Sequence, residues 1–269
     1  MAHTLTLDSQ TSTRGGESTT TPDVDLESPD VRIAREELAA CFRLAAMHGF
    51  EEGICNHFSA MVPGSDRYFL VNPFGLAFEE VTASSLLVCD LDGHVVTGNG
   101  VPEATAFYIH ARVHRAHPRV RVAFHTHMPW ATALAMSEGP PLVWAGQTAL
   151  KFYGRTAVDT DYNGLALGNE EGDRIAAAMG DADIVFMKHH GVMVAGPTIA
   201  EAWDDLYYLE RACEVQCKAM STGRELRPVP EAIARRTAQE MRAGDPASAR
   251  AHLDSAMRRL RAAGVAFDQ

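Results

Sequence analysis

Histidine is the residue type whose number and spacing in this sequence point most directly to chemistry. Seven of the twelve histidines lie between Glu103 and His190, and histidine is the side chain most often used for metal binding and proton transfer. In the run VRVAFHTH over 120–127, alternate residues of a strand project to the same face about 6 to 7 Å apart. His125 and His127 would then reach one ion above the strand, so we expect them to bind a metal together.

A metal site that is open to substrate needs about three protein ligands, and a neutral imidazole nitrogen binds a first-row divalent ion at about 2.0 to 2.1 Å. The best candidate for the third ligand lies in Lys188-His189-His190-Gly191, where an apolar strand ends at a glycine and the chain turns. Neighbouring residues on a strand point to opposite faces, so only one of these two histidines can join the pair. Paired surface or core histidines would give the same HxH pattern without a metal.

The elements that must position these histidines form an α/β pattern. We expect a three-layer α/β/α sandwich with a largely antiparallel central sheet. Residues 1–30 are rich in Ser, Thr, Gly and Asp and are expected to be a disordered tail, and 31–269 to be a single domain with a helical C-terminal extension from about 225. Hydrophobic periodicity, caps and turn residues predict helices over 28–49, 103–117, 131–136, 170–179 and 198–223. They also predict strands and hairpins over 53–100, with a hairpin turn at Asp92-Gly93, and one strand each over 120–127 and 183–196.

Composition excludes several classes of function. The net charge of -11 and a pI near 5.5 would repel phosphate backbones and anionic lipid, so neither a nucleic acid nor a membrane is an expected partner. The sequence has no run of 18 apolar residues and begins without a basic or apolar leader, so we expect a cytoplasmic protein. The five cysteines include no CxxC pair and are expected to be small core residues, with a shared ligand at Cys213 and Cys217 as the alternative.

Four segments resemble one known family, in that family's order: CNHFSAMVPG (55–64), NPFGL (72–76), FYIHARVHRAHPRVRVAFHTH (107–127) and HHGVMVAG (189–196). The sequence resembles the class II aldolase and adducin head-domain family over roughly residues 31 to 225. The resemblance implies a cyclic homotetramer with active sites between subunits, and zinc or another divalent ion bound by three histidines. Those ligands match His125, His127 and His190, with His189 standing where the family usually has Asn.

The resemblance also implies residues that bind substrate. Asn56 and Ser59 match the family's Gly-Asn-x-Ser loop, which contacts substrate, and ordinary turn chemistry is the alternative. Gly75, in the segment NPFG, is expected to allow either a close backbone approach at the substrate site or a positive φ.

One departure from the family concerns proton transfer. The family's sugar-phosphate aldolases have a Ser-Ser-Glu triplet, whose serines hold phosphate and whose Glu moves the proton. Aligned on His110, that triplet is Ala104-Thr105-Ala106 here. Glu103 lies seven residues before His110 on the same helix face, which makes it the candidate catalytic base. The alternative is an acidic residue that the helix dipole favours in a first turn.

These features predict a metal-dependent enzyme that acts on a carbon–carbon bond of a 2-oxo acid. The sequence resembles one branch of the family well: non-heme iron oxygenases that oxidatively decarboxylate a prenylated 4-hydroxyphenylpyruvate to the 4-hydroxybenzoate. That resemblance implies one divalent ion per subunit, Fe(II) in preference to Zn, with an aromatic 2-oxo acid and dioxygen as small-molecule partners. Two alternatives remain open: a zinc aldolase or decarboxylase for a non-phosphorylated substrate, and an adducin-like assembly module that needs no metal.

Overall fold

The computed structural model describes residues 24–165 and 168–269. Within these residues one eight-stranded sheet has the order β4-β3-β2-β1-β5-β8-β7-β6. All neighbouring strands are antiparallel except β6 and β7, which confirms the largely antiparallel sheet. The strands are β1 (His57–Met61), β2 (Tyr68–Val71), β3 (Leu87–Asp90), β4 (Val95–Thr97), β5 (Val122–Thr126), β6 (Thr156–Asp159), β7 (Ile184–Met187) and β8 (Gly191–Gly196).

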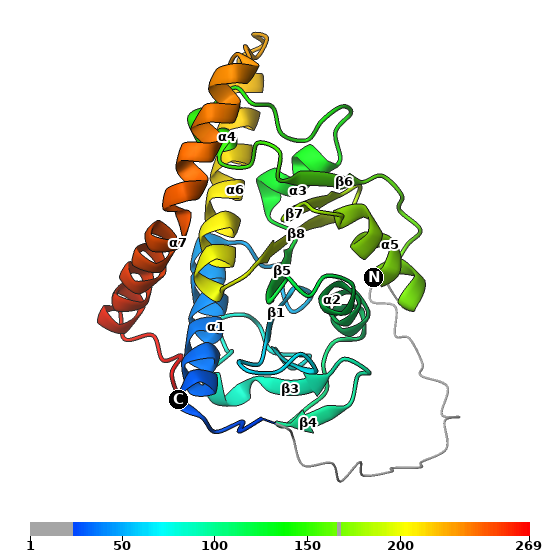
Figure 1. Cartoon of the computed structure of the whole chain (residues 1–269), viewed down its shortest axis with the longest axis vertical. Coiled ribbons are helices and arrows are strands. Elements are labelled where there is room, and N and C mark those ends of the chain that lie inside the picture. Colours follow the sequence, from blue (N-terminus) through cyan, green and yellow to red (C-terminus); the bar gives the residue numbers. More distant parts are fainter. Residues whose placement is uncertain (1–23, 166–167) are drawn as a thin grey trace.

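Helices cover both faces of this sheet, as Figure 1 shows, with α1, α6 and α7 on one side and α2 and α5 on the other. The arrangement confirms the three-layer α/β/α sandwich. The helices are α1 (Pro29–His48), α2 (Ala104–Ala116), α3 (Pro129–Ala135), α4 (Gln147–Leu150), α5 (Asn169–Met179), α6 (Ile199–Met220) and α7 (Glu231–Ala262), with a short 3-10 turn at Ala83–Ser85. Of the tail expected over residues 1–30, positions 1–23 lie outside the described residues.

Strand β5 divides its side chains between two hydrophobic cores. Val122 and Phe124 lie in the larger core, which α1, α6 and α7 cover. Ala123 lies on the opposite face, in the core that α2 and α5 cover. This is the alternation that the sequence predicts, because successive residues of a strand point to opposite faces. His125, two residues after Ala123, therefore faces the α2 side of the sheet.

The C-terminal extension is an integral part of the larger core. Leu253 and Leu260 of α7 are fully buried there, together with Phe267 beyond the helix. Helix α7 runs along α6 and α1 at one side of the molecule (Figure 1). In the part of the chain that the structure describes, no helix combines the length and apolarity that crossing a bilayer requires.

The apolar run 183–196 differs from the prediction. It forms two antiparallel strands, β7 and β8, in place of one continuous strand. His189, in the connecting turn, has a φ of 59°. This left-handed conformation does not occur within an extended strand. The turn sets His190 directly before β8, which pairs with β5. The spatial separation of the two adjacent histidines thus comes from turn geometry and not from strand alternation.

Gly191 brings the start of β8 unusually close to β5. A Cβ atom at this position would lie 2.6 Å from the carbonyl oxygen of Thr126 and 2.8 Å from Cδ2 of His127. Any larger residue would push the two strands apart. The glycine that follows His190 therefore lets this histidine approach His127.

The cysteines follow the expectation of core residues only in part. All five are free; Cys41, Cys89 and Cys213 are buried, whereas Cys55 is exposed and Cys217 is half-buried. The prediction was wrong for Cys55, which lies exposed in the loop before β1.

Candidate metal centre

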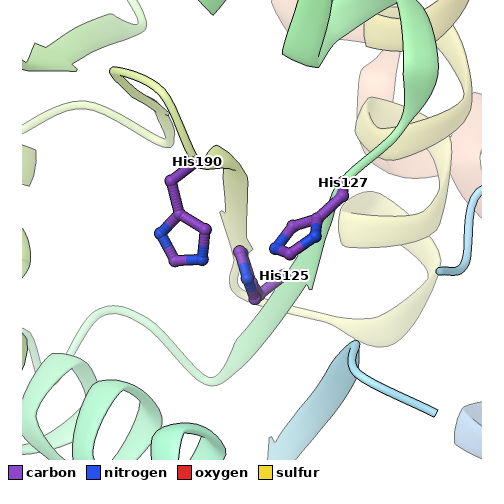
Figure 2. A group of neighbouring side chains, drawn as sticks. All are labelled: His125, His127 and His190. Carbon is purple, nitrogen blue, oxygen red and sulfur yellow. The ribbon is translucent and has the colours of Figure 1, made fainter. Parts of the chain in front are cut away.

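Three histidines from two adjacent strand ends converge, as Figure 2 shows. One ligand nitrogen from each of His125, His127 and His190 lies within 4.8 Å of the others. Their ring centroids are 4.7 to 5.0 Å apart. These are the three positions that the sequence and the family resemblance select, and the structure brings all three together.

His125 is oriented by the backbone of the neighbouring strand. Its Nδ1–H donates a hydrogen bond to the carbonyl oxygen of Val192 at 2.9 Å, which leaves Nε2 without a proton in the neutral ring. Burial, followed by the nearby His190, holds the pKa of His125 well below its ordinary value. A neutral imidazole fixed by a carbonyl on one nitrogen and free on the other is the form that binds a metal.

His127 is oriented by a carboxylate. Its Nδ1 is paired with the Glu52 carboxylate, while its Nε2 is buried without a hydrogen-bond partner among the described residues. A buried polar atom without a partner costs free energy unless something occupies the position. The donor set and this unpartnered nitrogen fit a divalent ion. Sequence reasoning did not find Glu52, because nothing in the Glu51-Glu52-Gly53 loop marks which carboxylate will reach a histidine 75 positions away.

His190 completes the group from the turn before β8. Burial, followed by the neighbouring His127 and Arg174, lowers the pKa of His190 to about 4. Its imidazole is therefore neutral at physiological pH and can bind a metal. His189, by contrast, lies beside Tyr162, with 6.3 Å between ring centroids, and does not join the group of three.

Glu103 stands at the N-cap of α2. Its carboxylate accepts hydrogen bonds from the backbone N–H of Ala106 at 2.8 Å and from the Thr105 hydroxyl. Its Oε2 also lies 3.9 Å from Nε2 of His57, and the His57 ring is 4.9 Å from that of His125. Glu103 thus caps α2 and is also separated from the three histidines only by the His57 side chain.

The substrate residues expected from the resemblance occupy three different environments. Asn56 is buried beside the centre, where its Oδ1 accepts from the His127 backbone N–H at 3.4 Å and its Nδ2 has no partner among the described residues. Ser59 is fully buried, and its hydroxyl contacts His110 and His114. Gly75 is exposed with a φ of 92°, as the positive-φ expectation required. Direct substrate contact by Ser59 and Gly75 stays a prediction without support from this geometry.

Comparison with known proteins gives the family. The family described as "Class II Aldolase and Adducin N-terminal domain" matches residues 36–217. The chain belongs to this family. A class II relative from Caulobacter vibrioides, named "Putative aldolase class 2 protein", is 39% identical over 194 residues, which are 71% of this chain and 74% of that protein.

Solved structures agree with this class II aldolase and adducin assignment. The crystal structure of an aldolase II superfamily protein from Pseudomonas syringae matches with a TM-score of 0.84 and 32% identity over 90% of this chain and 97% of that one. An L-fuculose 1-phosphate aldolase from Glaciozyma antarctica matches with a TM-score of 0.76 and 27% identity over 85% and 90% of the two chains. Helix α7 lies beyond the segment that the family model matches.

Proposed function

We propose that this class II aldolase-family chain is a divalent-metal enzyme of lyase type that cleaves or forms a carbon–carbon bond in a non-phosphorylated 2-oxo or 2-hydroxy acid. The observation that carries the proposal is the buried, unpartnered Nε2 of His127 beside His125 and His190. Zinc is the favoured ion, because class II aldolases usually use it. The ion would be held by the three histidines, as the family resemblance implies.

Each protein group has a distinct task in this proposal. When bound, the ion supplies Lewis-acid polarisation of a substrate oxygen. His125 and His127 offer Nε2, since their Nδ1 atoms are used by Val192 and Glu52. Glu103 is the proton carrier, because a carbon–carbon cleavage must take a proton from a hydroxyl and return one to carbon. The segment Ala104-Thr105-Ala106 lacks the paired serines that hold a phosphate in family aldolases, which favours a non-phosphorylated substrate.

A second candidate is the Fe(II) oxygenase that converts a prenylated 4-hydroxyphenylpyruvate to the 4-hydroxybenzoate. The replaced Ser-Ser-Glu triplet favours it, because oxidative decarboxylation does not need that proton carrier. The position of Glu103 weakens this argument, since a carboxylate 3.9 Å from His57 is available beside the centre. We therefore rank Fe(II) chemistry second.

An adducin-like assembly module without metal is the third possibility and has the least support. It would leave Nε2 of His127 buried and unpaired, at a cost of about 1 to 3 kcal/mol. Nothing in such a module would compensate for the convergence of three buried or half-buried imidazoles.

Assembly into a homotetramer with the site between subunits is part of the proposal and rests on the family resemblance. Glu52, beside His127, has 67% of its side chain exposed in the single chain, so this side of the site is accessible to a neighbouring subunit. Light scattering is expected to give four chains per particle. An active monomer would contradict this part of the proposal.

The dependence on dioxygen separates the two enzymatic candidates. Zinc-loaded protein is expected to turn over under nitrogen, and Glu103→Gln to lower the rate about a hundredfold or more. Glu138→Gln, at an exposed carboxylate, is the matched control and should keep the wild-type rate. Stoichiometric oxygen uptake with an arylpyruvate, Fe(II) dependence and inhibition by zinc would establish the oxygenase instead.

A further inference from the structure

A row of buried hydrogen bonds runs between strand β1 and helix α2, behind the candidate metal centre. Nδ1 of His114 lies 3.0 Å from the carbonyl oxygen of Val120, and its Nε2 lies 2.8 Å from the Ser59 hydroxyl. The same hydroxyl is 2.5 Å from Nδ1 of His110, whose Nε2 is 2.8 Å from Nδ1 of His57. None of these four side chains is more than 5% exposed.

The carbonyl at one end fixes the direction of every bond in this row. A carbonyl oxygen can only accept, so His114 carries its proton on Nδ1 and its Nε2 must accept from Ser59. The Ser59 oxygen then accepts from Nδ1–H of His110. Nε2 of His110 in turn accepts from Nδ1–H of His57. With neutral rings, the row has one arrangement of protons, and it leaves Nε2 of His57 as a lone pair.

The Ser59 hydroxyl has one competing acceptor, the carbonyl oxygen of Ala123 at 3.5 Å. That distance is at the limit of a hydrogen bond, whereas Nε2 of His114 is at 2.8 Å. The shorter contact therefore takes the hydroxyl proton, and the direction of the row is kept.

The lone pair of His57 lies at the metal centre. The His57 ring is 4.9 Å from that of His125, and the neighbouring residue, Asn56, contacts the His127 backbone. Asn56 carries a buried Nδ2 without a partner among the described residues. Adjacent positions of the chain thus offer one free donor, from Asn56, and one free acceptor, from His57. A ligand matches both when it has an oxygen that accepts and a hydroxyl that donates.

We infer that His57 accepts a hydrogen bond from a hydroxyl of the bound substrate, and that the substrate is a 2-hydroxy acid. The row from Val120 through His114, Ser59 and His110 holds the acceptor nitrogen of His57 in place. The inference deepens the proposed function and rests on it, because the metal must hold the substrate at this point. In this arrangement Ser59, His110 and His114 are positioning residues, since they act through His57.

The test compares two small ligands that differ in one hydrogen-bond donor. Glycolate and methoxyacetate share a carboxylate and a neighbouring oxygen, but methoxyacetate has no O–H. Binding to cobalt-substituted protein is followed through the visible spectrum of the metal. Wild-type protein is expected to prefer glycolate roughly tenfold over methoxyacetate, because the methyl ether would leave the His57 acceptor covered and unpaired.

Substitutions locate the acceptor. Ser59→Ala and His57→Phe are expected to reduce the preference for glycolate to about twofold or less, while Ser59→Thr, which keeps the hydroxyl, should retain it. Glu103→Gln should also retain it. The inference is overturned if Glu103→Gln abolishes the preference while Ser59→Ala keeps it, because Glu103 would then be the acceptor. It is also overturned if the cobalt protein binds both ligands equally.

A second measurement examines the row without any ligand or variant. Nitrogen NMR of histidine-labelled protein should show the rings of His57, His110 and His114 all protonated at Nδ1 and bare at Nε2. Protonation at Nε2 in any of these three rings would contradict the arrangement. Failure of the protein to take up cobalt would refute the proposed metal centre itself, whereas cobalt uptake without a glycolate preference would refute only the substrate inference.

Discussion

At the scale of single residues, the candidate metal centre depends on the groups that orient its histidines as much as on the histidines themselves. Each of His125 and His127 is fixed through Nδ1, one by the Val192 carbonyl and the other by the Glu52 carboxylate. Such outer contacts set the tautomer and the direction of an imidazole. Glu52 is the more easily tested of the two, since its partner is a side chain.

Replacing Glu52 by Gln should weaken metal binding tenfold to a hundredfold, because the amide is a weaker acceptor for the Nδ1–H of His127. Zinc affinity measured by competition with a chelator gives the value directly. Glu138→Gln serves as the control and should bind zinc like the wild type. An unchanged affinity in Glu52→Gln would show that the carboxylate does not orient His127.

The candidate site residues that the sequence predicts are those whose signal is local. His125 and His127 follow from strand alternation, and His190 and Glu103 from the family motifs and helix spacing. Glu52 and His57 could not be identified in this way, because their partners lie far along the chain and only the folded sheet brings them together. The sequence does contain a weak signal for the contacts between β1 and α2. His57 and Ser59 lie two residues apart on β1 and so share a face, and His110 and His114 lie one turn apart on α2.

At the scale of elements, the β7–β8 hairpin and its glycine decide where His190 stands. The sequence predicts an apolar segment over 183–196 but does not separate it into two strands, because both halves are equally apolar and no Asn-Gly or Asp-Gly pair marks the turn. The left-handed φ of His189 makes the turn instead. Where such a pair does exist, at Asp92-Gly93, the chain turns between the antiparallel strands β3 and β4.

Gly191→Ala should therefore damage the centre more than the fold. A Cβ only 2.6 Å from the Thr126 carbonyl oxygen forces β8 away from β5, at an expected cost of about 1 to 3 kcal/mol in the free energy of unfolding, with loss of zinc affinity. Denaturant titration and chelator competition measure the two effects. Gly244→Ala is the control, because its Cβ meets open space within α7, and it should keep full zinc affinity. Wild-type zinc affinity in Gly191→Ala would contradict this role of the glycine.

At the scale of the whole molecule, a row of buried neutral histidines should make stability depend on pH. Burial, followed by the nearby His190 and His127, lowers the pKa of His57 to about 3. Burial likewise lowers the pKa values of His114 and His190 to about 4. Below the ordinary value of about 6.5, the unfolded chain takes up protons that the folded chain does not, so stability rises with pH between about 4 and 6.5 and is lost as the pH falls through that window.

The metal-free protein should consequently melt at a lower temperature at pH 5 than at pH 7. Each of these three groups contributes about 2 kcal/mol to the difference in stability. Together they are expected to lower the melting temperature by roughly 10 to 20 °C. Thermal unfolding in the presence of a chelator measures it. His94→Gln is the control. His94 is exposed, and its hydrogen bond to Asp90 raises its pKa, so the variant should still show the fall in melting temperature between pH 7 and pH 5. A melting temperature that is constant from pH 7 to pH 5 would contradict the buried neutral state.

The measurement that tests the central claim most directly is the metal content of purified protein after incubation with zinc and removal of excess ion. Wild-type protein and His189→Asn, in which the turn keeps a residue that tolerates the left-handed conformation, are expected to hold about one zinc per chain. His190→Ala is expected to hold almost none while remaining folded. Zinc retained by His190→Ala but lost from His189→Asn, or a wild-type protein that binds no zinc or iron, would contradict the account.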